Sequence, residues 1–593
     1  MPSSGAESYQ AQAKAWLQAD FDSSTRRQLQ KIIDDNDQDA LKQAFDGRME
    51  FGTAGLRGLM GVGPVNMNRL VIRQTTAGLA DHLLAVNKVA AQNHGVVIAY
   101  DGRHGSNIFA EDAAGVLAAR GVKVLLFDKM HPTPLGAFAV KHLNAVAGVV
   151  VTASHNPPQY NGYKVYWQGG NQINDPIDEQ IAAAISHVAA KDSTPKALSL
   201  SDAQSVGLLQ YLGDEVFASY QKELLKTVSV SGAKGKDGLV VAYTPLHGVG
   251  APFAEALLKQ TGISNVHTVK VQREADGDFP TVNFPNPEEK GAMDLVIALA
   301  DEKDAQIAVA NDPDADRLAA CARTKDGKMR QLTGDQLGSL LGERMLSRAP
   351  KGSWALSTVV SSRLLSRLAL DMGAQHQETL TGFKWLGAVA KNIQERGDHF
   401  AFAYEEALGY MVSPMVWDKD GLTAIVALCE LAAELNASGE SLWDQLERIQ
   451  RRVGASVTMP RTIRLSHGSQ GSDLMKKLRA DLPKSIAHHQ VIMISDLLDN
   501  PKKPADPKQV PKNDVLSFYF ADETHSASSS EADILLGAPR IIVRPSGTEP
   551  KVKIYCEKLG KIGVEEQYES AMRRIESDLN DLVDAFYTFA IKL

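Results

Sequence analysis

A serine motif follows directly after an apolar run in this 593-residue chain. The motif, residues 152–158, reads Thr-Ala-Ser-His-Asn-Pro-Pro. A Ser at the carboxyl end of a parallel strand lies where α/β folds bind ligands, and His155 beside Ser154 could carry a proton. The nucleophile elbow of hydrolases needs glycines two positions either side of the Ser, whereas this chain has Thr152 and Asn156, so acyl transfer is disfavoured. An ordinary Ser/Asn/Pro turn is an equal alternative.

An aspartate motif follows the predicted strand 307–310. It places three carboxylates at alternate positions: Asp312, Asp314 and Asp316. Oxygen ligands of this kind suit a hard cation, and three packed carboxylates repel one another without one. A calcium loop would need Gly and Glu where Arg317 and Arg323 stand, so a magnesium site for phosphate chemistry is favoured. A solvated Asp-rich turn is the alternative.

A third motif lies between the predicted strands 540–543 and 552–557. Backbone N–H groups of a Ser-Gly-Thr turn can form an anion-binding concavity, and a guanidinium fits phosphate geometry. The motif therefore predicts a phosphate-binding loop, with a plain hairpin loop as the alternative. Its residues are Arg544, Ser546, Gly547 and Thr548.

Two further motifs are weaker signals. Glu405 and Glu406 follow the predicted strand 400–403 and could bind sugar hydroxyls, although a solvated turn is equally consistent with them. The Gly-rich segment 51–58 contains Arg57, which could bind an anion, although a plain turn is the simpler interpretation. The chain has neither a P-loop nor a dinucleotide-binding glycine motif, so ATP and NAD are not indicated.

The elements that must position these motifs alternate between strand and helix. Residues 11–45 are predicted to be helical, and three later stretches each repeat a strand–helix–strand rhythm typical of a mostly parallel sheet. The tail from residue 466 differs, with polar loops, two strands and a final helix over 564–586. We therefore predict an α/β fold class, with three related α/β domains and a C-terminal α+β domain. The ranges predicted as strands are 96–100, 122–127, 149–151, 239–243, 266–271, 307–310, 354–360 and 400–404.

Composition excludes several classes of protein. The net charge of −8 comes without a basic stripe, so no nucleic-acid partner is expected. No run of 18 apolar residues occurs and the N-terminus resembles no secretory signal, so no membrane partner is expected and a cytoplasmic location is predicted. The three cysteines are too far apart to suggest disulfides or a zinc site and are predicted to be buried: Cys321, Cys429 and Cys556.

Taken together and in this order, these segments resemble the α-D-phosphohexomutase superfamily, within it the phosphoglucomutase/phosphopentomutase branch. The segments that carry the resemblance are RMEFGTAGLRG (48–58), TASHNPPQYNGYKVY (152–166), YTPLHGVG (243–250), NDPDADR (311–317), TLTGFKWLG (379–387), YEEALGY (404–410), DKDG (418–421) and RPSGTEPKVKIY (544–555). The resemblance implies four domains around a central cleft, which we place at residues 1–205, 206–325, 326–465 and 466–593.

The resemblance also implies roles for individual residues. Ser154 would be a phosphoserine and, with the three aspartates, a ligand of Mg²⁺. Residues near it would transfer protons or stabilise charge: Arg57, His155 and Lys164. Lys419 would lie in the active-site cleft. Substrate would contact Arg317, Thr381, Gly382, Glu405 and Ala407, and the phosphate would be bound by Arg544, Ser546, Gly547 and Thr548. Ala407 departs from the Ser of many relatives, which removes one sugar hydrogen bond and suits a pentose-tolerant enzyme.

The implied activity is a phosphosugar mutase, an isomerase that acts as an intramolecular phosphotransferase. Glucose 1-phosphate and glucose 6-phosphate are the expected substrates, with glucose 1,6-bisphosphate as intermediate and activator. Phosphopentomutase, phosphomannomutase and glucose 1,6-bisphosphate synthase activities stay open as alternatives, as does a silent sugar-phosphate-binding protein. The sequence does not indicate an oligomeric state.

Overall fold

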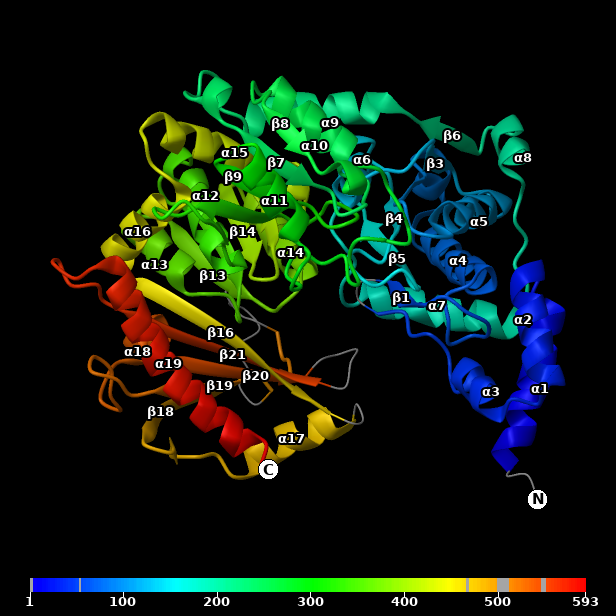
Figure 1. Cartoon of the computed structure of the whole chain (residues 1–593). Coiled ribbons are helices and arrows are strands. Elements are labelled where there is room, and N and C mark those ends of the chain that lie inside the picture. The colour runs from blue at the N-terminus through cyan, green and yellow to red at the C-terminus, as the bar shows by residue number, and fades with distance from the viewer. Residues whose placement is uncertain (1–3, 53–54, 466–468, 499–510, 546–550) are drawn as a thin grey trace. The chain divides into compact units, whose positions relative to one another are not determined.

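The computed structural model describes residues 4–52, 55–465, 469–498, 511–545 and 551–593 (Figure 1). The chain divides into two compact units. The first comprises residues 1–332 with 409–439, and the second comprises residues 333–408 with 440–593.

Three short helices open the first unit and share a small apolar core. They are α1 (Ser4–Ala19), α2 (Ser23–Asp34) and α3 (Gln38–Phe45). The Asp22 side chain caps α2 by accepting a hydrogen bond from the backbone N–H of Ser24, as its position before a polar helix start predicts. The buried residues of this core include Ala13, Leu29, Leu41 and Phe45. The helical prediction for residues 11–45 is therefore confirmed.

The first sheet has the order β1-β5-β4-β2-β3-β6. Strands β2, β3, β4 and β6 are parallel, and β5 and β1 continue the sheet antiparallel. The three central strands are apolar and buried on both faces, which is typical of parallel sheets covered by helices. Its elements are β1 (Leu56–Leu59), α4 (Arg69–Asn93), β2 (Val96–Tyr100), α5 (Ser106–Ala119), β3 (Val124–Phe127), α6 (Thr133–His142), β4 (Ala147–Val151), β5 (Tyr160–Trp167), α7 (Ile177–Lys191), α8 (Leu200–Ser205) and β6 (Leu209–Leu212).

The second sheet has the order β11-β10-β9-β7-β8, with β7, β8 and β9 parallel. The predicted strand 266–271 is wrong in its extent, because β8 ends at Thr268 and a 3₁₀ turn, Lys270–Gln272, follows. The elements are α9 (Asp214–Thr227), β7 (Val241–Thr244), α10 (Ala251–Gln260), β8 (Val266–Thr268), α11 (Asp294–Glu302), β9 (Ile307–Ala310), β10 (Ala319–Arg323) and β11 (Met329–Gln331), to which the same unit adds β15 (Gly409–Met411) and α15 (Gly421–Ala437).

The second unit contains a parallel arrangement of three strands and a separate antiparallel sheet. The parallel strands have the order β13-β12-β14. Their elements are α12 (Gly334–Arg348), β12 (Trp354–Thr358), α13 (Leu364–Asp371), β13 (Gln375–Thr379), α14 (Phe383–Glu395), β14 (Phe400–Glu405) and α16 (Leu442–Val453). The antiparallel sheet has the order β16-β21-β20-β19-β18-β17. Its elements are β16 (Ala455–Arg464), α17 (Ser469–Ala480), β17 (Ser485–Ile486), β18 (His489–Asp496), β19 (Leu516–Phe520), α18 (Glu531–Gly537), β20 (Arg540–Pro545), β21 (Lys551–Gly560) and α19 (Tyr568–Ala590).

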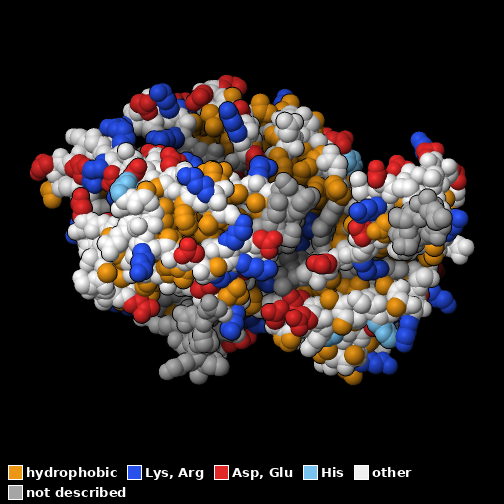
Figure 2. Space-filling model, turned by 90° about the horizontal axis from the view of Figure 1, so that it is seen from below, with side chains coloured by type: hydrophobic (Ala, Val, Ile, Leu, Met, Phe, Trp, Pro, Cys, Tyr) orange, Lys and Arg blue, Asp and Glu red, His pale blue; other side chains and the backbone are white. Residues whose placement is uncertain are grey.

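The three parallel sheets share one topology. Each contains three consecutive parallel strands of which the first in the sequence is central, the second pairs on one side of it and the third on the other. The orders are β3-β2-β4, β8-β7-β9 and β13-β12-β14. This common order confirms three related α/β units followed by a different C-terminal sheet. Figure 2 shows basic and acidic side chains interspersed on the face in view. Cys321, Cys429 and Cys556 are buried and unpaired, as predicted.

No single helix in the described ranges is both long and apolar enough to cross a bilayer, although α15 and α16 together pass as one bent pair by length and composition.

Candidate active site

Ser154 lies in the loop at the carboxyl end of β4, where the strand pattern predicts a ligand site. Its backbone adopts a left-handed conformation with φ of 52°, which is uncommon outside glycine, and its N–H donates to Thr152 Oγ1 at 2.8 Å. The side chain is buried. Its hydroxyl donates to Asp312 Oδ2 at 2.8 Å and lies 3.2 Å from His155 Nδ1. The structure thus joins the serine and aspartate motifs, which are 158 residues apart.

Arg103 holds the serine loop in place. It lies in the loop after β2, is buried, and donates to the carbonyl of Ser154 at 2.6 Å and that of Pro157 at 2.9 Å. It also donates to the carbonyls of Asn156 and Tyr160. No motif in the sequence pointed to Arg103. The signal that could have found it is the polar segment Asp101–Ser106 directly after a predicted parallel strand.

The aspartate loop follows β9, and all three of its carboxylates are fully buried. Burial, with Asp314 and Asp316 nearby, raises the pKa of Asp312 well above its usual range. Burial opposes ionisation of Asp314 as well, but the Lys164 ammonium outweighs it and lowers the pKa of that carboxyl. The loop therefore packs three carboxyl groups together where water is excluded.

The residues of this loop fit a divalent cation. One carboxylate oxygen from each of Asp312, Asp314 and Asp316 lies within 4.8 Å of the others. The Oδ1 atoms of Asp314 and Asp316 are buried and have no hydrogen-bond partner in the described part of the chain. Buried unpaired carboxylate oxygens are costly, and a hard cation is the group that satisfies such a set.

Two lysines lie beside the aspartates. Lys164, from β5, donates to Asp314 Oδ2 at 2.8 Å and to Asp316 Oδ2 at 2.9 Å. Lys419 lies 3.5 Å from Asp316 and 3.2 Å from Asp418. Burial by itself lowers the pKa of each ammonium, but the neighbouring carboxylates outweigh burial and raise it, so both lysines stay charged.

Glycines allow two segments to approach the aspartate loop closely. A Cβ at Gly421, in the predicted DKDG motif, would lie 2.4 Å from the Arg317 carbonyl oxygen and 2.7 Å from that of Ala315. A Cβ at Gly248, in the YTPLHGVG motif, would lie 2.3 Å from Cα of Pro313. These two motifs therefore shape the backbone around the carboxylates.

The remaining predicted residues of the first unit surround Ser154. Arg57 is exposed on β1 and donates to Asn156 Oδ1 at 3.3 Å. Burial, with Arg317 and Arg57 nearby, lowers the pKa of the His155 imidazole well below its usual value, so this ring is neutral near pH 7. The backbone N–H of Arg317 donates to Asp312 Oδ1 at 3.1 Å, which helps to fix the loop.

The predicted sugar-binding residues lie in the second unit. Glu405 is the last residue of β14, and Ala407 lies in the turn that follows. Both side chains are half-buried. Thr381 follows β13, and Gly382, with φ of 106°, precedes α14. Glu406, to which the sequence assigned no separate role, accepts hydrogen bonds from Thr358 and Ser361. Burial, followed by repulsion from Glu405, raises the pKa of Glu406 to about 8.

Arg544 is the penultimate residue of β20 and belongs to the same unit as these glutamates. Burial raises the pKa of Tyr555 on β21; the charges of Glu406 and Glu405 raise it further, and the charge of Arg544 lowers it. The other members of the predicted phosphate-binding loop, Ser546, Gly547 and Thr548, lie outside the described residues.

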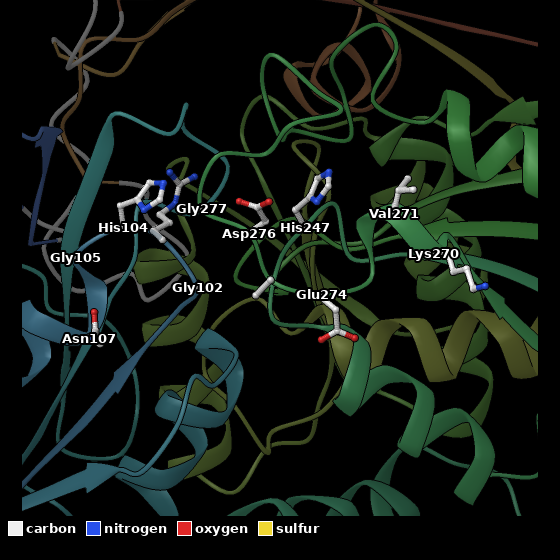
Figure 3. Close-up of a pocket in the computed structure, with 12 residues that line it drawn as sticks. Gly102, His104, Gly105, Asn107, His247, Lys270, Val271, Glu274, Asp276 and Gly277 are labelled. Carbon is white, nitrogen blue, oxygen red and sulfur yellow. The ribbon is translucent and has the colours of Figure 1, made fainter.

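A separate cavity of about 450 Å³ is lined by residues that include His104, His247 and Asp276 (Figure 3). Its walls come from the loop after β2, the loop after β7 and residues 270–277. Neither Ser154 nor the three aspartates line it, so it is separate from the candidate site. Arg103 is its only lining residue with a described hydrogen bond to the Ser154 loop.

The sequence matches four family models in order. They describe α/β/α domains I, II and III and the C-terminal domain of phosphoglucomutase/phosphomannomutase, and they match residues 48–192, 218–327, 333–451 and 503–567. The exact limits of the domains stay a prediction.

Three curated relatives carry different names. A human phosphopentomutase is 36% identical over 96% of this chain and 94% of its own. A probable phosphomannomutase of Haemophilus influenzae is 39% identical over 84% of this chain and 94% of its own. A human glucose 1,6-bisphosphate synthase is 31% identical over 96% of this chain and 92% of its own.

The fold is also known from solved structures. A phosphoglucomutase (parafusin) from Paramecium in its open form has a TM-score of 0.65 and 18% identity, covering 91% of this chain and 96% of its own. The domain models and the curated relatives show that the chain is an enzyme of the phosphotransferase isomerase, or mutase, class. With all four domain models matched in order and relatives similar over nearly its whole length, it belongs to the phosphoglucomutase/phosphomannomutase family.

Proposed function

We propose that this enzyme moves a phosphoryl group between two positions of one sugar and carries that group on Ser154 during the exchange. The observation that carries the proposal is the buried contact of 2.8 Å between Ser154 Oγ and Asp312 Oδ2, beside two carboxylate oxygens that have no partner among the described residues. A phosphate on this oxygen would lie against the aspartate loop.

The proposed exchange has two symmetrical halves. In the first, a free hydroxyl of the sugar monophosphate attacks the phosphorus of phospho-Ser154, the bond from phosphorus to Ser154 Oγ breaks, and a sugar bisphosphate forms. The hydroxyl proton passes to a nearby base, for which the neutral His155, 3.2 Å from Ser154 Oγ, is the candidate. In the second half, the other phosphate returns to Ser154. Glucose 1,6-bisphosphate is the corresponding intermediate and activator for a glucose substrate.

Asp312, Asp314 and Asp316, with the phosphorylated Ser154, would hold Mg²⁺. The ion would supply positive charge to the transferring phosphoryl group. The chain's own contribution is positioning. Arg103 fixes the serine loop by donating to the loop's carbonyls, and Lys164 pairs with Asp314 and Asp316.

Residues of the second unit are proposed to bind substrate as well. Glu405 and Thr381 would contact sugar hydroxyls, with Gly382 and Ala407 lining the same loops. Arg544 would bind the phosphate that is not being transferred, together with Ser546, Gly547 and Thr548. Arg57 and Lys419 would stabilise charge near the phosphoserine. We retain the four domain ranges 1–205, 206–325, 326–465 and 466–593 as part of this proposal.

Glucose 1-phosphate is the first proposed substrate. A pentose 1-phosphate is the second, and two observations favour it: Ala407 lacks a hydroxyl for a sugar hydrogen bond, and the human relative that spans 96% of this chain is named phosphopentomutase. A coupled assay of kcat/KM with glucose, mannose, ribose and deoxyribose 1-phosphates separates these candidates. A synthase would instead consume an acyl-phosphate donor stoichiometrically.

Two experiments test the mechanism. Intact-mass analysis of active enzyme should show one phosphoryl adduct that Ser154→Ala abolishes together with activity. A fully active wild type without the adduct would contradict the phosphoserine. Chelation should abolish turnover and Mg²⁺ should restore it, whereas unchanged turnover in chelator would contradict the aspartate site. A silent binding protein would show no turnover of any of these sugar phosphates.

A further inference from the structure

Two histidines and an aspartate converge on the surface of the C-terminal sheet domain. His488 lies in the turn between β17 and β18, His489 begins β18, and Asp581 projects from α19. The Nε2 atoms of His488 and His489 lie 3.0 Å and 3.2 Å from the same oxygen, Asp581 Oδ2. None of these residues has a role in the proposed mutase chemistry.

The local backbone explains why both imidazoles face one carboxylate. Successive residues of a strand project to opposite faces, but His488 precedes the strand in a two-residue turn that begins at Ala487, whose φ is 52°. Ile486 pairs with His489 across this turn. The two rings therefore lie together, with centroids 4.0 Å apart.

The tertiary packing fixes the third residue. Helix α19 inserts Leu579, Leu582 and Val583 into the core of the domain. Asp581 therefore points away from that core, and its side chain is 60% exposed. The arrangement depends on two elements, the β17–β18 hairpin and α19, and not on one flexible segment.

We propose that His488, His489 and Asp581 bind a divalent transition-metal ion of the Zn²⁺ class. Imidazole nitrogens and a carboxylate oxygen are ligands that such ions favour. With bonds of about 2.0–2.1 Å and tetrahedral angles, ligand atoms lie roughly 3.3 Å apart, close to the nitrogen–oxygen spacings found here. All three ligand atoms lie within 4.8 Å of one another. The exposed His488 side leaves room for a water ligand.

The alternative is an ordinary imidazolium–carboxylate pair. Against it, His489 Nε2 is buried and makes no hydrogen bond in the described structure, although Asp581 Oδ2 is near.

The test counts metal equivalents in the full chain. Chelator-stripped protein is saturated with Mg²⁺ and then titrated with Zn²⁺ near neutral pH against a chromophoric chelator. The wild type should bind one Zn²⁺ equivalent more than the double variant His488→Asn, His489→Asn. Asp581→Asn should raise the dissociation constant of that Zn²⁺ equivalent at least tenfold. The control is His187→Asn, at an exposed position on α7, which should leave that constant unchanged. With Cu²⁺ as the probe, electron paramagnetic resonance should show two coupled nitrogens only when both histidines are present.

Because the ion would connect the hairpin to α19, Zn²⁺ should also slow hydrogen exchange in residues 485–490 of the wild type and not of the double variant. Equal Zn²⁺ stoichiometry and affinity in the wild type and the double variant would overturn the proposal. The proposal would also be overturned if Asp581→Asn lost the extra Zn²⁺ equivalent while the double histidine variant kept it. The site would then not depend on the imidazoles.

Discussion

Lys164 is expected to be the most important single charge for the stability of the metal-free protein. Its ammonium lies 2.8 Å from Asp314 and 2.9 Å from Asp316, and all three side chains are buried. At an effective dielectric constant of about 20, each pair contributes roughly 6 kcal/mol of Coulomb energy, most of it offset by desolvation. Breaking a buried pair costs about 3–5 kcal/mol, since the partner charge is left unpaired. Lys164→Met should therefore lower the free energy of unfolding by about 3–5 kcal/mol in chelator.

The measurement is a urea titration in excess chelator, combined with hydrogen exchange of peptides that cover β4, β5 and the aspartate loop. Lys129→Met is the matched control, because Lys129 pairs with Asp214 at 2.6 Å on the surface, where such pairs contribute little. Mg²⁺ should restore more stability to Lys164→Met than to the wild type, because the ion would neutralise the same carboxylates. A loss below about 1 kcal/mol in chelator would refute the reasoning.

Three further predictions concern positioning and pH. Gly421→Ala should displace the aspartate loop, because the added Cβ would lie 2.4 and 2.7 Å from backbone oxygens. A Mg²⁺ activation curve should then show kcat reduced by at least about tenfold and a higher half-maximal Mg²⁺ concentration. An unchanged curve would contradict this prediction. Arg103→Lys should lower kcat about tenfold or more in steady-state kinetics, at nearly constant KM. The reason is that one ammonium cannot donate to four loop carbonyls as the guanidinium does. A change confined to KM would argue against a role of Arg103 in positioning Ser154. The pKa of Glu406 is raised to about 8 in the folded protein, so the native state holds a proton that the unfolded state loses at lower pH. The free energy of unfolding should therefore fall as pH rises from about 4.5 to about 8. In thermal scans, Glu406→Gln should lose less stability than the wild type over that range, and parallel losses would contradict the raised pKa.

Much of the fold follows from local sequence patterns. The apolar runs predicted as strands at 96–100 and 307–310 are β2 and β9 with the same bounds, because buried parallel strands need continuous apolar residues. The predicted strand 266–271 extended too far. Its second half is a 3₁₀ turn, and alternating apolar and polar residues of that length do not distinguish the two.

The candidate site was only partly readable from the sequence. Ser154 and the aspartates could be found because polar residues directly after apolar strands mark the ligand-binding edge of a sheet. Arg103 could not be found in this way, because its role depends on where the carbonyls of residues 154–160 lie in space. The sequence does not distinguish Glu406 from Glu405. The distinction comes from the hydrogen bonds that Glu406 accepts from Thr358 and Ser361.

The chemical groups of the candidate site follow from the sequence: a serine hydroxyl and three carboxylates directly after predicted strands, with basic residues in the neighbouring motifs. The contact of the Ser154 hydroxyl with Asp312, and the pairing of Lys164 with the other two aspartates, come from the packing of the chain. Residue types and strand ends are local properties of the chain. Charge pairing between the first and second sheets depends on how those sheets pack, and no local pattern encodes that packing.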